Sequence, residues 1–117
     1  MNREEMKART KKFALRTIHL VGELPSSTTA NVLGKQLLRA ATSVGANYRA
    51  ACRAKSRADF IAKLGIVEEE ADECGYWFDL IVEAGLMKRE HVADLMCEAD
   101  EITAITVASI KTARSNR

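Results

Sequence analysis

Five cations gather in a short part of the chain, between two runs of residues that repeat with helical spacing. They are Arg49, Arg53, Lys55, Arg57 and Lys63, and a single carboxylate lies among them. Arginine and lysine side chains bind phosphate groups and release counterions as they do so, which gives affinity for nucleic acid without reading its sequence. The cluster therefore predicts a surface that contacts the backbone of structured RNA or another nucleic acid.

A second interpretation of this cluster is a solvated corner between two helices whose charges are partly paired. Arg53 and Lys55 lie at the end of a predicted helix, where cations offset the helix dipole. Asp59 and Lys63 are four residues apart and can form an ion pair. Arg57, in the first turn of the next helix, opposes the dipole and is not explained this way. Further cations would extend a binding surface if the fold brings them near: Arg39 and the N-terminal residues Arg3, Lys7, Arg9, Lys11, Lys12 and Arg16.

The sequence offers no pattern for catalysis or for a metal. A di-iron site in a helical bundle needs a Glu-x-x-His pair on two helices. Arg16 precedes His19 and Lys88 precedes His91 by three residues, so the acidic run EEEADE at 68–73 has no histidine to complete such a site. There is also no GxSxG motif, no phosphate-binding glycine loop and no recognisable Cys–His spacing. We expect a protein that is not an enzyme and has neither a metal nor another cofactor.

Composition favours a small helical protein. The chain has 117 residues, of which 47% are hydrophobic and only 5% aromatic, with a single proline and a formal net charge of +2. That length suits one domain with one core. The three cysteines form no CxxC pair, so we expect reduced thiols that fill the core. No apolar run is long enough to span a membrane. We therefore expect a soluble, cytoplasmic protein.

Four stretches carry apolar residues at alternating steps of three and four, the pattern of helices with one buried face. The first stripe is Met6, Thr10, Phe13, Thr17, Leu20 and Leu24, and the second is Leu33, Leu37, Ala40, Val44, Asn47 and Ala51. The third is Phe60, Leu64, Val67, Ala71, Cys74, Phe78 and Ile81, and the fourth is Val92, Leu95, Met96, Ala99, Ile102, Ile105, Thr106 and Ile110.

The boundaries of these helices have their own signals. Pro25 stops the first helix, Thr28 or Thr29 is expected to cap the second, and Ser56 to cap the third. Gly85 is expected to end the third helix in the left-handed conformation. Because the connections are short, neighbouring helices must run antiparallel. The sequence predicts an all-α fold, an antiparallel up-down-up-down four-helix bundle that forms a single domain over residues 1–117.

Two surfaces beyond the main stripes could contact another subunit. On the third helix, Trp77 lies on a strip with Ile66, Glu70 and Glu73, and tryptophan is common at subunit contacts. On the second helix, small residues beside Tyr48 allow close approach of a neighbouring backbone, either within the bundle or between subunits. We also expect Asn47 to be buried and hydrogen-bonded across helices, because an unpaired amide in a core costs about 1–3 kcal/mol.

The segment 33–77, LGKQLLRAATSVGANYRAACRAKSRADFIAKLGIVEEEADECGYW, resembles the four-helix bundle proteins encoded in intervening sequences of bacterial 23S ribosomal RNA genes. The positions that fit the family's pattern are Gln36, Leu38, Arg39, Ala40, Ala41, Ser43, Ala46, Asn47, Tyr48, Arg49, Ala51, Arg53, Ser56, Asp59, Phe60, Glu69, Glu70, Asp72, Tyr76 and Trp77. Three positions depart from the pattern. Relatives commonly have Glu at the position of Ala50, and Cys74 and Gly75 also differ from the residues expected there.

This resemblance implies a left-handed antiparallel bundle that assembles as a homopentamer. The chain is also similar, more distantly, to the accessory proteins of diversity-generating retroelements, which bind nucleic acid and a reverse transcriptase. Together with the basic cluster, the resemblance leads us to expect an oligomeric bundle that binds structured RNA or DNA. The alternative is a protein-interaction scaffold with no nucleic-acid role, in which Trp77 and Tyr48 contact other subunits or a protein partner.

Overall fold

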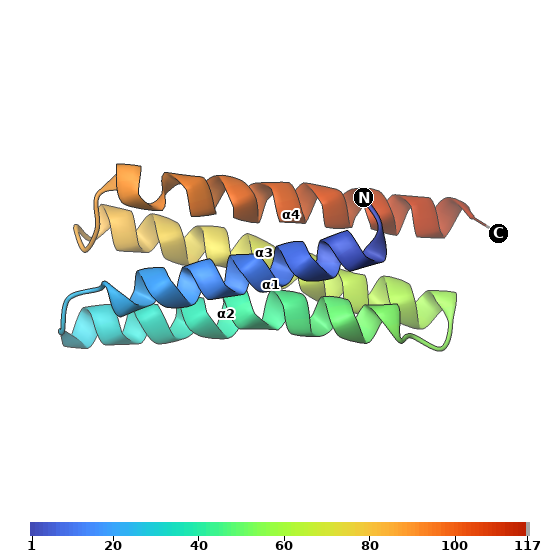
Figure 1. The fold of residues 1–117 in the computed structure, drawn as a ribbon, viewed down its shortest axis with the longest axis horizontal. Helices are drawn as coiled ribbons and strands as arrows, with labels where there is room; N and C mark the ends of the chain where they lie inside the picture. Colours follow the sequence, from blue (N-terminus) through green and yellow to red (C-terminus); the bar gives the residue numbers. More distant parts are fainter. Residues whose placement is uncertain (117) are drawn as a thin grey trace.

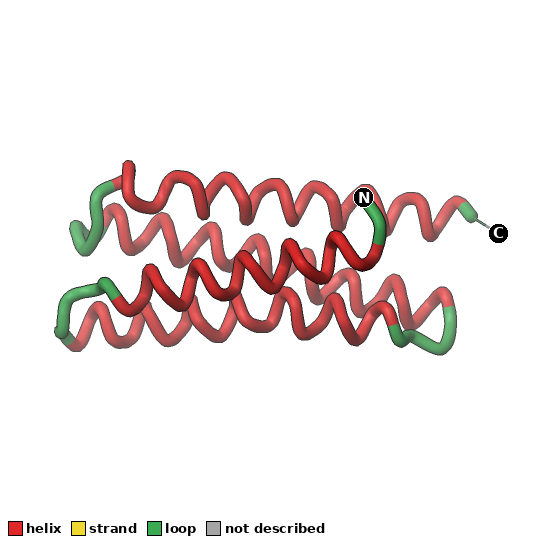
Figure 2. Tube along the Cα trace, viewed as in Figure 1, coloured by secondary structure: helices red, strands yellow, loops and turns green. Residues whose placement is uncertain are grey.

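Four helices make up the computed structural model, which describes residues 1–116. They are α1 (Arg3–Gly22), α2 (Thr28–Cys52), α3 (Arg57–Glu83) and α4 (Arg89–Ser115). The helices lie side by side along one axis and each runs opposite to the next in the chain (Figure 1), in a body of 50 × 21 × 20 Å. Between them are only short loops, and no strand occurs in residues 1–116 (Figure 2). The predicted all-α, up-down-up-down bundle is confirmed.

Side-chain caps start three of the helices. The amide oxygen of Asn2 accepts a hydrogen bond from the backbone N–H of Glu5 at 2.8 Å, and the Glu5 carboxylate accepts one from the Asn2 N–H, which forms a capping box at α1. The Ser56 hydroxyl accepts from the N–H of Asp59 at 3.0 Å, as predicted for α3. These caps satisfy amides that have no partner within the helix.

The predicted cap of α2 is wrong by one residue. Ser27, with an extended backbone, accepts from the N–H of Ala30 at 3.1 Å, whereas Thr28 and Thr29 already lie in the first turn. All three residue types can cap, so the composition of SSTT does not single one out. Downstream of α3, Gly85 has a φ of +76°, which confirms the predicted left-handed end.

The four predicted stripes form one core. Phe13 and Phe78 meet edge to face near its middle, with ring centroids 6.3 Å apart. Three buried threonines each donate a hydrogen bond to the carbonyl four residues earlier, so their hydroxyls add no unpaired polar group. The core consists of Met6, Phe13, Leu20, Leu37, Ala40, Ala41, Val44, Tyr48, Ala51, Leu64, Val67, Ala71, Cys74, Phe78, Ile81, Val92, Leu95, Ala99, Ile102 and Ile110.

Small residues on α2 serve packing within the bundle. A Cβ at Gly45 would lie 3.3 Å from the Thr10 hydroxyl oxygen, and one at Gly34 would lie 3.1 Å from a Val21 methyl. α1 therefore approaches α2 closely because these positions carry no side chain. The stripe of small residues is covered by this chain's own first helix.

Asn47 does not bridge helices, and that prediction is wrong. It is half-buried, and its amide nitrogen donates to the Ser43 carbonyl at 2.8 Å inside α2. The buried line of α2 runs through Val44, Tyr48 and Ala51, which leaves Asn47 at the edge of the core. At an edge, one bond to its own helix and contact with solvent satisfy the amide.

The cysteines differ from the expected core-filling set. Cys74 is buried, Cys52 is half-buried and Cys97 is exposed on α4. Burial raises the pKa of Cys74 to about 12. None of the helices in the described part of the chain has an apolar stretch long enough to cross a membrane.

These environments predict three rates of thiol labelling. Because the thiolate is the reactive form, Cys97 should react rapidly with an aromatic disulfide reagent at pH 8, Cys52 more slowly, and Cys74 only after unfolding. Mass spectrometry of tryptic peptides during a labelling time course measures this order. Labelling of Cys74 in the native protein as fast as Cys97 would contradict the buried position.

Substitutions at two glycines should change stability in opposite directions, because Gly45 lies at the close contact of α1 with α2 and Gly75 has open space beside it. Gly45→Leu should lower the free energy of unfolding by about 1–3 kcal/mol, because the side chain must displace α1. Gly75→Ala is the control: no atom lies within 4 Å of a Cβ there, and it should raise stability by about 0.5–1 kcal/mol. Urea unfolding followed by circular dichroism measures both. If Gly45→Leu changed assembly size and left stability unchanged, the small-residue stripe would be a contact between subunits.

Candidate nucleic-acid interface

The predicted basic cluster occupies the tight corner between α2 and α3. α2 ends at Cys52. There the Arg53 N–H donates to the Ala50 carbonyl and the Ala54 N–H to the Ala51 carbonyl, and the Ser56 cap starts α3 after a short turn. The corner places Arg49 on the last turn of α2, Arg53 directly after it, Lys55 in the turn and Arg57 at the first residue of α3. These four cations thus lie at one end of the bundle.

Only one member of the predicted cluster is paired. Lys63 donates to the Asp59 carboxylate at 2.7 Å, and this hydrogen bond, together with the nearby Lys55, holds the pKa of Asp59 below its usual value. Within residues 1–116, Arg49, Arg53, Lys55 and Arg57 form no ion pair. Four unpaired cations therefore share the corner, and the charge of Lys63 is largely offset.

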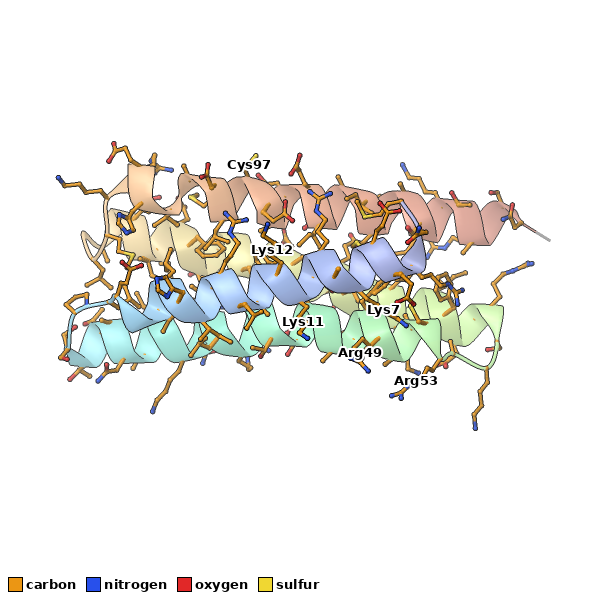
Figure 3. All side chains as sticks on the ribbon, viewed as in Figure 1. Lys7, Lys11, Lys12, Arg49, Arg53 and Cys97 are labelled. Carbon is orange, nitrogen blue, oxygen red and sulfur yellow. The ribbon has the colours of Figure 1, made fainter. Side chains whose placement is uncertain are left out.

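The beginning of α1 reaches this corner. The Arg3 guanidinium donates to the Cys52 carbonyl at 3.4 Å and lies 5.4 Å from the centroid of the Phe60 ring. Figure 3 shows Lys7 and Lys11 on the edge of α1 nearer to α2, with Arg49 and Arg53 below them at the end of α2. Lys7 also has Glu4 at 3.3 Å, an exposed contact of small energy. Part of the N-terminal cluster thus extends the corner along α1 and α2.

Other cations from the sequence are used inside the bundle. Arg9 forms two hydrogen bonds of 2.7 Å with Glu98 and one of 2.9 Å with Glu101 on α4. Arg39 pairs with Glu70 at 2.9 Å and with Glu73. Neither arginine extends the binding surface as expected, because carboxylates on α4 and α3 offset their charges. Lys12 lies on the other side of α1 from Lys11 (Figure 3).

A groove of about 850 Å³ opens at the same end of the bundle. It exists because α1 has 20 residues and α4 has 27, so the last turns of α4 continue past the start of α1. The groove is lined by Met1, Arg3, Tyr48, Ala51, Cys52, Ala54, Lys55, Ser56, Arg57, Phe60, Ile105, Ala108, Ser109, Thr112, Ala113 and Asn116. Sequence reasoning missed it, because the first and fourth stripes have the same span and the groove depends on how the helix ends are staggered.

The two residues proposed for a subunit contact lie in different environments. Trp77 is half-buried, packs edge to face with exposed Tyr76 at 5.1 Å, and its covered indole N–H has no partner among the described residues. Tyr48 is only 8% exposed and belongs to the core. Its burial raises the pKa of Tyr48 to about 12. Trp77 thus has more surface left for a partner than Tyr48.

Histidines and carboxylates do not assemble into a metal-binding group in the part of the chain that the structure describes. His19 and His91 are both exposed, and His91 lies 3.6 Å from the carboxylate of Glu23.

Comparison with known proteins places this arrangement in a family. The model of the 23S rRNA-intervening sequence protein family matches residues 3–108. The chain belongs to this family. A crystal structure of a protein of unknown function from the S23 ribosomal protein family of Bacteroides thetaiotaomicron is similar, with 37% sequence identity and a TM-score of 0.88. The alignment covers 95% of this chain and 99% of that one. No curated protein matches.

The predicted family is thereby confirmed. The more distant similarity to retroelement accessory proteins, and the homopentamer, stay predictions. The bundle of this 23S rRNA-intervening sequence protein has the helices that the family resemblance implies, and its basic corner falls within the matched residues.

The ion pair between Arg9 on α1 and Glu98 on α4 predicts how the stability of the fold changes at low pH. Hydrogen bonding to Arg9 lowers the pKa of Glu98, so the pair stabilises the fold at neutral pH, and this contribution is lost as the pH falls through the lowered pKa. Arg9→Met should reduce the free energy of unfolding by about 1 kcal/mol at pH 7. The difference from the unmodified protein should shrink below about pH 4.

Urea unfolding at a series of pH values measures this difference. Lys12→Met is the matched control, because it removes an exposed cation from the same helix. A loss of stability in Arg9→Met that stays constant down to low pH would mean that packing of the Arg9 stem, and not the ion pair, holds α1 to α4.

Proposed function

We propose that this 23S rRNA-intervening sequence protein is a non-catalytic, oligomeric bundle that binds structured RNA or other nucleic acid through phosphate contacts. The contact surface consists of Arg49, Arg53, Lys55 and Arg57, extended by Lys7 and Lys11 on α1. Lys63 lies at its margin with Asp59. The proposal includes a cytoplasmic location, where ribosomal RNA is available and thiols stay reduced.

One observation carries this proposal: the bundle pairs some of its arginines with carboxylates and leaves others unpaired. Arg9 and Arg39 each contact two glutamates, whereas the four corner cations have no carboxylate partner within residues 1–116. Clustered unpaired cations repel one another and raise the local positive potential, which attracts a polyanion. The family name supports ribosomal RNA as the first nucleic acid to test.

Assembly would strengthen such binding. The net charge of one chain is only +2, and four phosphate contacts give modest affinity. A homopentameric ring, as the family resemblance implies, would repeat the corner around an axis and bind several phosphates of one RNA at once. Oligomerisation is part of the proposal because it turns a weak local attraction into useful affinity.

The test is a fluorescence polarisation titration with a labelled hairpin fragment of 23S ribosomal RNA. Four phosphate contacts predict a loss of affinity on the order of 100-fold between 50 and 200 mM salt. Arg49→Ala with Arg53→Ala should weaken binding and reduce the slope of log K against log salt by about 2. The control is Lys35→Ala with Lys88→Ala, which removes two cations at the opposite end of the bundle.

Two results would overturn the proposal. One is an absence of binding even at low salt, and the other is equal weakening by the corner pair and the control pair. The second result would mean that net charge alone, and not the corner, attracts the RNA.

A second candidate function is a protein-interaction scaffold, which the Trp77 surface favours. The covered indole N–H of Trp77 lacks a partner within residues 1–116, and Tyr76 and Ile66 are exposed at 58% and 42% on the same helix. Size-exclusion chromatography with light scattering, with absorbance read at 260 and 280 nm before and after nuclease, separates the two functions. A partner that survives nuclease supports a scaffold, whereas loss of material absorbing at 260 nm supports nucleic-acid binding.

A further inference from the structure

The groove at the open end of the bundle adds a feature that phosphate contacts alone do not use. We propose that it receives an unpaired nucleotide, so that the preferred RNA contains a loop, a bulge or a free end and is not a continuous duplex. This inference rests on the proposed function, because it specifies which kind of nucleic acid the same end of the bundle binds.

The charge of the groove fits a nucleotide. Its rim carries Arg3, Lys55 and Arg57, and no aspartate or glutamate occurs among the described residues that line it. Lys55 and Arg57 are also members of the unpaired corner. A strand whose phosphates contact the corner is therefore led past the opening of the groove, where the next phosphate meets Arg3.

The floor of the groove fits a base. Phe60 lies there with the Arg3 guanidinium 5.4 Å from its ring centroid, and the Cys52 carbonyl holds that guanidinium in place. Unstacked RNA bases stack on aromatic rings and on guanidinium planes. Tyr48 and Ile105 complete an apolar floor. Moving a neutral base from water onto this floor costs less free energy than moving a charged group there.

The opposite wall leaves room for the base because α4 presents small side chains there. Ala108, Ser109, Thr112 and Ala113 line the groove on the last turns of α4. The Ser109 hydroxyl donates to the Ile105 carbonyl at 3.0 Å, so its oxygen can accept from a base or a ribose hydroxyl. A volume of about 850 Å³ is within the range of sites that hold small organic ligands.

A duplex cannot use this floor. Its bases are stacked and paired inside the helix, so it presents phosphates and sugars to the rim and reaches no further. An unpaired strand presents both its phosphates and its base faces. An acidic peptide with apolar side chains would also meet the rim, but the corner cations that continue along α1 and α2 match the regular charge of a nucleic-acid backbone better.

The experiment compares two fluorescein-labelled RNA probes with equal numbers of phosphates, a blunt duplex and a single strand, at the same salt concentration. The unmodified protein should bind the single strand about tenfold more tightly, since stacking of a base on protein side chains changes affinity by about that factor or more. Ala108→Phe fills the groove without changing any charge. It should remove most of this preference and leave duplex binding unchanged.

Ala104→Phe is the matched control, because it makes the same substitution one turn earlier on α4, at an exposed alanine outside the groove. It should alter neither affinity. A single strand with 5-iodouridine gives a readout that needs no variant: irradiation should crosslink it to the peptide that contains Phe60, as identified by mass spectrometry.

The outcomes distinguish the inference from the function on which it rests. Equal affinity for both probes, or crosslinks only outside the groove, overturns the inference and leaves phosphate binding by the corner intact. Failure of both probes to bind at low salt overturns the proposed function itself. An acidic amphipathic peptide that binds the unmodified protein and not Ala108→Phe, when neither RNA is sensitive to that change, would show that the groove belongs to a protein partner.

Discussion

Burial of one apolar stripe on each of four helices is the constraint on which the rest of this structure depends. A helix with one apolar face must cover that face, and four such helices with short connections do so only as antiparallel neighbours. The interior is then filled by Phe13, Phe78 and the aliphatic residues around them. Because none of the charged side chains in residues 1–116 is buried in that interior, binding is left to the outer surfaces and to the ends of the bundle, where helix lengths differ.

The distribution of carboxylates decides which cations remain available. Glu98 and Glu101 on α4 take Arg9, and Glu70 and Glu73 on α3 take Arg39, so these pairs join helices along two sides of the bundle. The corner between α2 and α3 has Asp59 alone, and Lys63 occupies it. Net charge therefore says little about recognition here. A nearly neutral chain still has an unpaired basic corner, because the nearby acids Glu4 and Asp59 contact Lys7 and Lys63 and not the four corner cations.

The sequence was sufficient for features set by local spacing and insufficient for features set by contacts between helices. Steps of three and four residues placed most core positions, although Ala41 and Tyr48 of α2 lay outside the predicted stripe. Ser56 and Gly85 marked the limits of α3, because each depends on a few neighbouring residues. The role of Asn47 was misjudged because a residue at the edge of a stripe turns inward or outward depending on how its helix is rotated. The partners of Arg9 lie 89 and 92 residues away, and only the register of α1 against α4 could reveal them.

The length of α1 links the fold to the candidate site. The capping box at Asn2 and Glu5 starts α1 where it can satisfy its own first amides, and α1 is seven residues shorter than α4, which corresponds to about 10 Å of helix. A longer α1 would lie against Ala108 and Thr112 and bury the floor around Phe60. Instead, Arg3 closes the side of that floor by bonding the end of α2. One boundary thus gives the bundle an apolar surface next to its unpaired cations, and a ligand that combines anionic and flat apolar groups meets both at this end.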